Sequence, residues 1–125
     1  AEQRSGRLAW RRKMSAYSAM ATDGRRLYVS DAEGVVWALD VRSGTAVWSQ
    51  EALKFRRLSD AQVLGNYVVV GDFEGYLHWI ERDSGELAGR SRVGSAPITT
   101  GMHVADDVLF VQGDDGDLAA FRLPQ

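Results

Sequence analysis

The sequence predicts an all-β fold built from repeated blades of four antiparallel strands, and three observations lead to that prediction. A motif in which an apolar run ends in a glycine turn recurs every 41 residues, at Gly34, Gly75 and Gly116. Runs of about four to eight β-branched, apolar and aromatic residues are bounded by Gly, Asp, Asn and Ser clusters. No stretch sustains the apolar period of a helix. Strand repeats of this length are typical of β-propellers, whose blades bury their faces against one another.

The first complete repeat is expected to contain four strands separated by glycine turns. The strands are predicted at residues 17–21, 27–31, 35–41 and 45–49, with turns at Asp23-Gly24, Glu33-Gly34 and Ser43-Gly44. Glycine supplies the positive φ that tight hairpins require, so each of these dipeptides indicates a chain reversal. The second repeat follows the same plan, with strands predicted at residues 59–64, 67–72, 76–82 and 86–92.

The two ends of the chain are offset within the repeat. The third repeat begins near residue 98 and stops after its third strand, whereas residues 6–10 match the fourth-strand residues 44–48. We therefore expect one partial propeller. Its parts are the last strand of a preceding blade (1–13), two blades (14–50 and 51–93) and a final blade that lacks its outer strand (94–125).

About three blades are too few for a closed ring, because propellers typically have about four to eight. The chain also starts without a methionine and without the apolar segment of a signal peptide. We expect it to be the carboxy-terminal portion of a larger propeller, or else to be completed by further copies or by a companion chain.

Composition limits the possible functions. The chain has 125 residues, 45% of them hydrophobic, and a net charge of −2; it lacks the strongly basic balance of a nucleic-acid-binding protein, so no nucleic-acid partner is expected. It has no cysteine, which excludes disulfides and thiolate metal sites and leaves the redox compartment open. No apolar run approaches the roughly 20 residues of a membrane-spanning helix.

In an antiparallel four-stranded blade, the turn between strands two and three lies at the same end as the connector to the next blade. Acidic turns and basic connectors are therefore expected to share one end of the propeller. The acidic residues are Asp31, Glu33, Asp72, Glu74, Asp114 and Asp115, and the basic ones are Arg11, Arg12, Lys13, Lys54, Arg56 and Arg57.

One connector, Lys54-Phe55-Arg56-Arg57, is the candidate partner-binding site. It combines three cationic side chains with an aromatic ring, and arginine and aromatic residues are enriched at protein interfaces. The alternative is an ordinary solvated loop.

Other chemistry-bearing residues have simpler structural explanations, and we expect no metal, no cofactor and no catalytic residue. Carboxylates before turn glycines suit hairpins, and no loop is long enough to wrap a calcium ion. His78 and His103 have no cysteine or second histidine at ligand spacing. An aromatic set is expected to pack between blades rather than to bind a quinone or a sugar: Trp37, Trp48, Tyr76 and Trp79.

Residues 38–48 resemble the tryptophan-docking repeat of pyrroloquinoline-quinone-type propellers. That repeat contains an alanine, an aspartate, a Ser/Thr-Gly pair and a terminal tryptophan, which here are Ala38, Asp40, Ser43-Gly44 and Trp48. The resemblance implies that the tryptophan wedges between blades. The second repeat departs from it, with Glu81 for the aspartate and Gly89 for the tryptophan. The predicted structural repeat positions are Trp10, Gly34, Asp40, Gly44, Trp48, Gly75, Trp79, Gly85 and Gly116.

Residues 71–80, Gly-Asp-Phe-Glu-Gly-Tyr-Leu-His-Trp-Ile, resemble a segment near the carboxy terminus of the BamB family of outer-membrane protein assembly lipoproteins, and the resemblance continues through residues 5–50 and 113–123. It implies an eight-bladed propeller held at the periplasmic face of the bacterial outer membrane by an amino-terminal lipid outside this chain. It also implies a non-enzymatic scaffold that binds the POTRA domains of BamA and assists the folding and insertion of outer-membrane proteins, with unfolded substrates as further partners.

Two rival functions stay open at this point. The tryptophan-docking pattern also fits a fragment of a PQQ-dependent quinoprotein dehydrogenase, which would need a bound quinone, a calcium ion and an acidic base. The other rival is a ligand-sensing propeller fused to a signalling domain.

Overall fold

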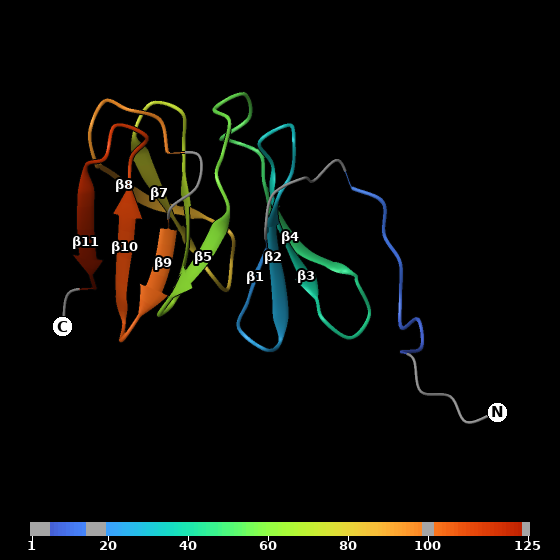
Figure 1. Ribbon diagram of the computed structural model, residues 1–125. Coiled ribbons are helices and arrows are strands. Elements are labelled where there is room, and N and C mark those ends of the chain that lie inside the picture. The colour runs from blue at the N-terminus through green and yellow to red at the C-terminus, as the bar shows by residue number, and fades with distance from the viewer. Residues whose placement is uncertain (1–5, 15–19, 99–101, 124–125) are drawn as a thin grey trace.

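Three antiparallel sheets make up the structure, a computed structural model that describes residues 6–14, 20–98 and 102–123 (Figure 1). The first sheet holds β1 (Ala21–Thr22), β2 (Arg26–Ser30), β3 (Val36–Asp40) and β4 (Ala46–Gln50). The second holds β5 (Ala61–Leu64), β6 (Tyr67–Gly71), β7 (Tyr76–Glu81) and β8 (Leu87–Arg92). The third holds β9 (Met102–Ala105), β10 (Val108–Gln112) and β11 (Leu118–Arg122). These described segments form no helix, so they include none long and apolar enough to cross a membrane.

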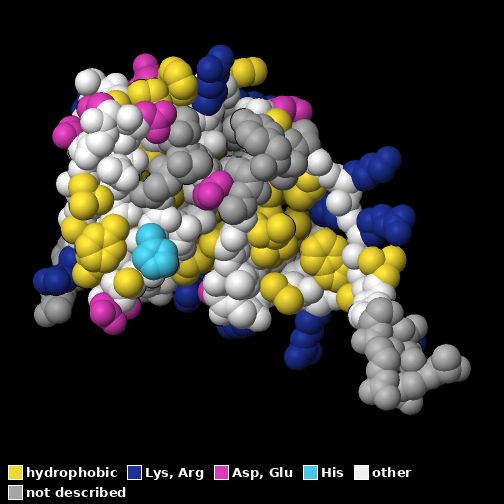
Figure 2. Space-filling view, viewed as in Figure 1, with side chains coloured by type: hydrophobic (Ala, Val, Ile, Leu, Met, Phe, Trp, Pro, Cys, Tyr) yellow, Lys and Arg dark blue, Asp and Glu magenta, His cyan; other side chains and the backbone are white. Residues whose placement is uncertain are grey.

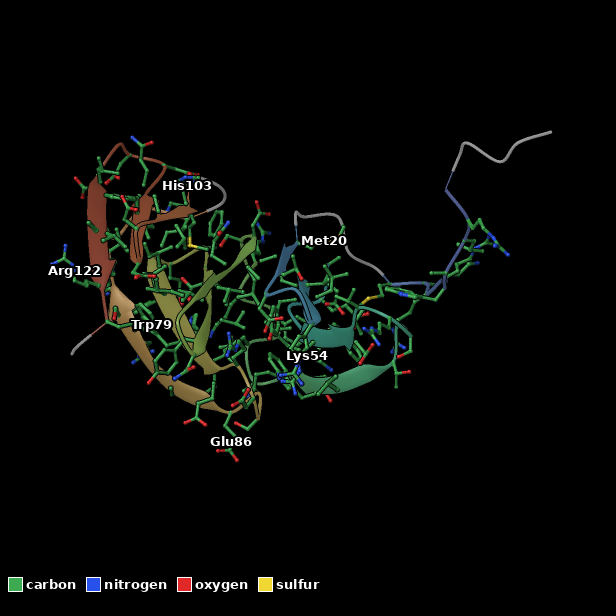
Figure 3. All side chains as sticks on the ribbon, turned by 90° about the horizontal axis from the view of Figure 1, so that it is seen from below. Met20, Lys54, Trp79, Glu86, His103 and Arg122 are labelled. Carbon is green, nitrogen blue, oxygen red and sulfur yellow. The ribbon has the colours of Figure 1, made fainter. Side chains whose placement is uncertain are left out.

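Each sheet is an up-and-down meander in which strands that follow one another in the chain pair with one another. The repeat is visible in the pairing, because three pairs recur at the same spacing. They are Arg26 with Asp40, Tyr67 with Glu81 and Val108 with Arg122. The prediction of an all-β fold made of antiparallel four-stranded blades is confirmed. Figures 1 and 3 show the three sheets side by side in chain order.

Most predicted strand bounds differ from the observed ones by one or two residues. The strand predicted at residues 17–21 lies largely outside the described residues. Residues 6–10 were expected to form a fourth strand, but they form none. A strand requires a hydrogen-bonded neighbour, and none of the described strands pairs with this segment. Trp10 nevertheless reaches the first blade, through its indole ring.

The core consists of two clusters, each between neighbouring blades. The first joins the first and second blades and contains Tyr28, Val36, Ala38, Trp48, Leu53, Ala61, Val68, Val70 and Ile80. The second joins the second and third blades and contains Leu64, Val69, Leu77, Ile98, Leu109 and Val111. Strand β6 supplies both, because successive side chains of a strand point to opposite faces of its sheet. Val68 and Val70 therefore face the first blade while Val69 faces the third, and all three are fully buried.

Glycines close the turns between second and third strands, and the structure separates two reasons for them. Gly75 and Gly116 both have a positive φ, of +90° and +95°. A methyl group on Gly75 would in addition collide with carbonyl oxygens of the following connector, at Gly94 and Ala96. A methyl group on Gly116 would meet nothing within 4 Å.

These two glycines provide a matched pair of variants. We expect Gly116→Ala to lower the free energy of unfolding by about 1–2 kcal/mol, the cost of a left-handed backbone for a residue with a Cβ. Gly75→Ala should cost roughly twice as much, since the collision with the connector adds to the backbone strain. Urea unfolding of the intact protein that carries this chain measures both losses. Equal losses would show that the connector yields freely.

Candidate partner-binding surface

The connector between β4 and β5 runs across one end of the first two blades. The amide of Phe55 donates a hydrogen bond to the carbonyl of Glu33 in the β2–β3 turn, at 3.3 Å. In the β6–β7 turn, the amide of Phe73 donates to the carbonyl of Arg56, at 3.0 Å. These bonds confirm that turns and connectors meet at one end of the blades.

Arg56 fastens the connector to the second blade. Its Nη1 lies 3.3 Å from Oδ2 of Asp72 and 3.4 Å from Oε1 of Glu74. The Asp72 carboxylate is completely buried, whereas the Glu74 side chain is 71% exposed. Little of the Arg56 charge is therefore free for a partner. The sequence placed Arg56 in the candidate binding site, and the structure gives it this internal role.

Asp72 is the centre of a buried polar network. Its Oδ1 accepts hydrogen bonds from the amides of Glu74 and Tyr76, at 2.8 and 3.0 Å, and its Oδ2 lies 2.7 Å from Nε2 of His78. Burial acts to raise the pKa of the Asp72 carboxyl, but the hydrogen bonds with His78 and with the two amides outweigh it and hold that pKa below its ordinary value. His78 is buried as well.

The same arrangement occurs one repeat earlier. Asp31 accepts hydrogen bonds from the amides of Glu33 and Val35, and its Oδ2 accepts one from Nε1–H of Trp37 at 2.9 Å. The aspartate and the ring that bonds to it are six residues apart in both repeats. This spacing is the sequence signal for the network, and the prediction missed it because it considered the two histidines apart from the turn carboxylates. His78 is thus the counterpart of a structural indole.

Phe55, Arg57 and Phe73 are exposed side chains at this end, and we call these three residues the connector surface. Phe55 is 90% exposed and Phe73 is 45% exposed. The guanidinium carbon of Arg57 lies 5.0 Å from the centre of the Phe73 ring, within cation–π range. Hydrophobic and basic side chains stand next to one another along the upper edge of the molecule in Figure 2. Lys54 is engaged within the connector, because its Nζ lies 3.1 Å from a Glu51 carboxylate oxygen.

Backbone strain coincides with the connector surface. Phe55 and Arg57 have φ values of +69° and +54°. Each such conformation costs about 1–3 kcal/mol in a residue with a Cβ, and strain of this kind clusters at binding and switch sites. Here it holds an aromatic ring in water, against the hydrophobic effect. Exposure and strain together make Phe55 the best candidate for a contact residue.

Two tryptophans dock onto the following blade, as the repeat resemblance implies. Trp48 is only 9% exposed, and its Nε1–H donates to the carbonyl of Arg82 in the second blade at 2.8 Å. Its ring covers Gly85, where a methyl group would collide with it. Trp10 covers Gly44 of the first blade in the same way.

The remaining repeat positions are turn or strand residues. Oδ1 of Asp40 accepts hydrogen bonds from the amides of Arg42 and Ser43, and these bonds lower the pKa of the Asp40 carboxyl. Trp79 lies half-buried on β7. The turns β2–β3, β6–β7 and β10–β11 are closed by Gly34, Gly75 and Gly116. Within the described ranges, no group of three or more His, Cys, Asp or Glu side chains is placed to hold a metal ion.

Up-and-down sheets, with one indole dock from Trp10 onto the first blade and another from Trp48 onto the second, define the class of this protein: it is made of tryptophan-docking propeller repeats. A family model described as "Outer membrane protein assembly factor BamB" matches residues 1–108. The chain belongs to the BamB family.

Curated relatives carry the same name, Outer membrane protein assembly factor BamB. The chain is 41% identical to the protein of Shewanella oneidensis over 123 residues, which is 98% of this chain and 31% of that protein. It is 43% identical to the protein of Xanthomonas campestris pv. campestris over 121 residues, 97% of this chain and 30% of that protein. Identity with the Escherichia coli K12 protein is 35%, over 90% of this chain and 29% of that protein. The chain thus spans less than a third of these relatives.

Solved structures share the fold. The crystal structure of BamB from Moraxella catarrhalis superimposes with a TM-score of 0.87 at 24% identity, over 94% of this chain and 36% of that one. A quinohemoprotein alcohol dehydrogenase from Pseudomonas putida HK5 gives a TM-score of 0.67 at 19% identity, over 88% of this chain and 19% of that one. At such identities the likeness concerns the fold alone.

Proposed function

We propose that this chain is part of a non-catalytic scaffold subunit of the outer-membrane β-barrel assembly machinery, and that its connector surface binds the POTRA domains of BamA. The names of the relatives support the role in outer-membrane protein assembly. The observation that carries the binding proposal is the strained, 90% exposed Phe55 beside Arg57. In the intact protein, an amino-terminal lipid holds this scaffold at the periplasmic face of the outer membrane, where unfolded outer-membrane proteins are further partners.

Binding explains the side chains of this end better than catalysis does. The one buried histidine beside it, His78, bonds to Asp72, and Asp72 is used by turn amides. Arg57 and Phe73 are instead arranged as interface residues commonly are, with a cation over an aromatic ring. A quinoprotein dehydrogenase is the alternative function, and its support is a likeness of fold at 19% identity.

The proposal predicts that the double variant Phe55→Ala and Arg57→Glu weakens binding of the intact protein to the isolated POTRA region of BamA at least about tenfold. A central aromatic and arginine pair commonly contributes at least about 1.4 kcal/mol, the equivalent of tenfold in affinity. Surface plasmon resonance with immobilised POTRA domains measures the effect. Both replaced side chains are exposed, and Phe55→Ala removes an aromatic ring from water, so the double variant should fold normally.

Arg25→Glu is the matched control, because Arg25 is exposed in the β1–β2 turn, at the other end of the first blade. It should bind as the unmodified protein does. If the double variant and the control bind alike, the connector surface is not the contact. If the unmodified protein itself fails to bind, BamA is not the partner, and a stoichiometric visible chromophore with bound calcium would then support the dehydrogenase alternative.

A further inference from the structure

One carboxylate oxygen, Oδ2 of Asp72, serves two side chains at once. Nε2 of His78 lies 2.7 Å from this oxygen and Nη1 of Arg56 lies 3.3 Å from it. The pKa of the Asp72 carboxyl is lowered, so the carboxylate is ionised at neutral pH and only accepts hydrogen bonds. Nε2 of His78 therefore carries a hydrogen and donates it. The other ring nitrogen, Nδ1, is left to gain or lose a proton.

His78 is buried but keeps contact with solvent. It is 4% exposed and lines a groove of about 290 Å³ together with Leu87, Ala88, Gly89 and Arg90 of β8. No residue in the described part of the chain forms a hydrogen bond with its Nδ1. Histidine is the side chain that ordinarily changes its charge between about pH 5 and 8. The imidazole can therefore take up a proton without opening the blade.

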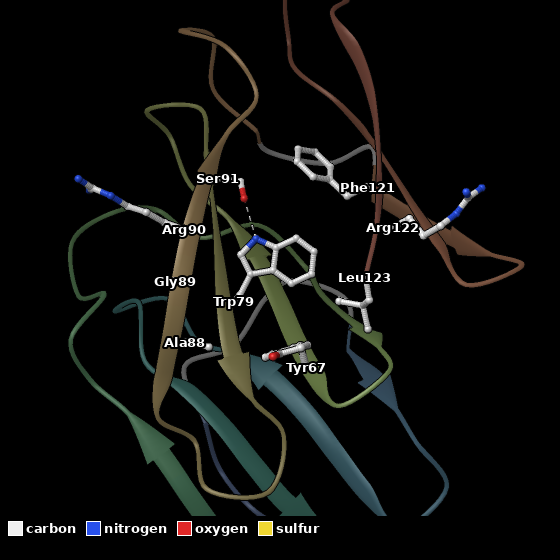
Figure 4. A pocket seen from close by; sticks show the side chains of 9 residues that line it. All are labelled: Tyr67, Trp79, Ala88, Gly89, Arg90, Ser91, Phe121, Arg122 and Leu123. Atoms are coloured by element: carbon white, nitrogen blue, oxygen red, sulfur yellow. Dashed lines mark hydrogen bonds between the residues drawn. The ribbon is translucent and has the colours of Figure 1, made fainter. Parts of the chain in front are cut away.

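The charges around His78 come mainly from three other elements. Arg90 lies opposite His78 in the β7–β8 pair, and in Figure 4 it extends away from Trp79, on the side of the sheet where His78 lies. The opposite residue on β6 is an uncharged valine. No charged residue of the first blade, as far as the structure describes it, forms an ion pair with His78. The titratable and charged neighbours are Asp72 and Glu74 in the β6–β7 turn, Arg56 in the connector, Arg90 on β8 and Tyr76 on β7 itself.

The first blade builds the same network with a ring that does not titrate. Nε1–H of Trp37 donates to Oδ2 of Asp31 at 2.9 Å, and Trp37 lies one repeat before His78. An indole has one N–H donor and no basic nitrogen. The turn can therefore be closed without an imidazole, and the second blade differs by having a ring whose charge depends on pH.

Arg56 lies between the two strained residues of the connector surface. Phe55 precedes it and Arg57 follows it, with φ values of +69° and +54°. Residues keep such conformations only where the surrounding structure holds them. The Arg56 side chain is anchored at the Asp72 carboxylate, and its carbonyl accepts a hydrogen bond from the amide of Phe73. A change that loosens Arg56 therefore acts on the whole connector surface.

We propose that His78 is a positioning residue for the connector surface, and that its protonation loosens this surface and weakens the binding of a partner as the pH falls. The observation that carries the proposal is the single carboxylate oxygen shared by His78 and Arg56. The inference rests on the proposed function and names a regulation of that same site.

The mechanism follows from the charges. A cationic imidazole donates a stronger, charge-assisted hydrogen bond to Oδ2 of Asp72 and repels the guanidinium of Arg56, which uses the same oxygen. Arg56 then turns to its second carboxylate, that of Glu74, which is 71% exposed and holds it less firmly. The strained residues on either side of Arg56 lose their anchor and relax toward ordinary backbone conformations.

The test measures binding of the intact protein to immobilised POTRA domains at about pH 7.5 and about pH 5.5, which span the usual titration of histidine. The unmodified protein should bind at least about fivefold more weakly at the lower pH, the lower end of the usual coupling between two sites. His78→Gln should remove this difference, because its amide donates to Oδ2 and stays uncharged. His78→Trp, which copies the first blade, is the second variant if the glutamine variant does not fold.

His103→Gln is the matched control, because His103 is the other histidine of the chain and lies exposed on β9 in the third blade. This variant should keep the full difference between the two pH values. Arg56→Gln removes the anchor itself. It should bind at both pH values about as weakly as the unmodified protein does at the lower one, and tight binding by this variant would overturn the proposal.

A fluorine label reports on the connector surface without POTRA domains. A single 4-fluorophenylalanine in place of Phe55 should change its fluorine NMR resonance between the two pH values, and His78→Gln should abolish that change. Equal binding at both pH values, or an undiminished pH difference in the His78 variants, would overturn the proposal. If POTRA domains bind at neither pH, the proposed function fails and the fluorine resonance decides the inference: a change that is lost in His78→Gln supports it, and a constant resonance overturns it.

Discussion

Replacing Trp48 by alanine in the intact protein should lower the free energy of unfolding by about 3–5 kcal/mol, the usual range for deletion of a large buried aromatic side chain. Trp48 is 9% exposed, and the centre of its ring lies 6.0 Å from the centre of the Tyr28 ring in the core between the first two blades. The variant also leaves the Arg82 carbonyl without its indole donor. Chemical denaturation followed by circular dichroism measures the loss.

Val47→Ala is the control for this prediction, because Val47 is the neighbour of Trp48 on β4 and is 44% exposed. Its effect should stay near about 0.5 kcal/mol, as for other surface positions. Trp48→Phe should fall between the two, since it keeps an aromatic ring and loses the hydrogen bond. A loss below about 1 kcal/mol for Trp48→Ala would mean that the blades stay together without the dock.

Removal of the Asp72 carboxylate should have an effect of similar size. Asp72→Ala leaves two turn amides and the His78 ring without their acceptor, and it removes the buried one of the two carboxylates that Arg56 contacts. Breaking a buried ion pair on one side commonly costs about 3–5 kcal/mol, so we expect a loss in that range. Glu74→Ala is the control: Glu74 meets the same arginine from an exposed position, and its loss should stay within about 1 kcal/mol.

The same carboxylate predicts a dependence of stability on pH. Its pKa is lowered in the folded protein, so the folded state holds the ionised form more strongly than the unfolded chain does. This stabilisation is complete above the ordinary aspartate pKa of about 3.9 and is lost as the pH falls through the lower, folded value. Asp72→Asn should remove this part of the acid sensitivity. Identical slopes of stability against pH for Asp72→Asn and the unmodified protein, between about pH 5 and 2, would contradict the assignment.

The repeat made most of the fold predictable, because the turn glycines and the apolar runs recur at one spacing. The pairing of Arg26 with Asp40 and of Tyr67 with Glu81 follows the same spacing. Residues 6–10 form no strand in the structure, and their assignment to the last strand of a preceding blade stays a prediction. Their sequence matches a fourth strand, but a strand depends on a neighbour that hydrogen-bonds to it, and sequence similarity does not supply one.

The site was predicted less completely, for a physical reason. The sequence places Lys54, Phe55, Arg56 and Arg57 together, but it does not show which cations meet carboxylates. Arg56 is neutralised by Asp72, which lies 16 residues away in the chain, whereas Arg57 lies over Phe73. The sequence shows that Gly89 departs from the repeat, which has Trp48 at this position. Only the strand pairing shows that Gly89 lies opposite Trp79, so that the small and the large residue have exchanged strands relative to Ala38 and Trp48.

The alternation of β6 between two cores has a consequence for how this blade finds its alignment. Val68, Val69 and Val70 are chemically identical, so a slip of the strand by one residue would still present valine to both neighbours. The middle of the strand therefore does not specify its own register. The register is set at the two ends of β6, where Gly65 reverses the chain and the Asp72 carboxylate accepts hydrogen bonds from the amides of its turn. In this blade, a glycine and an aspartate thus fix the alignment of the valines between them.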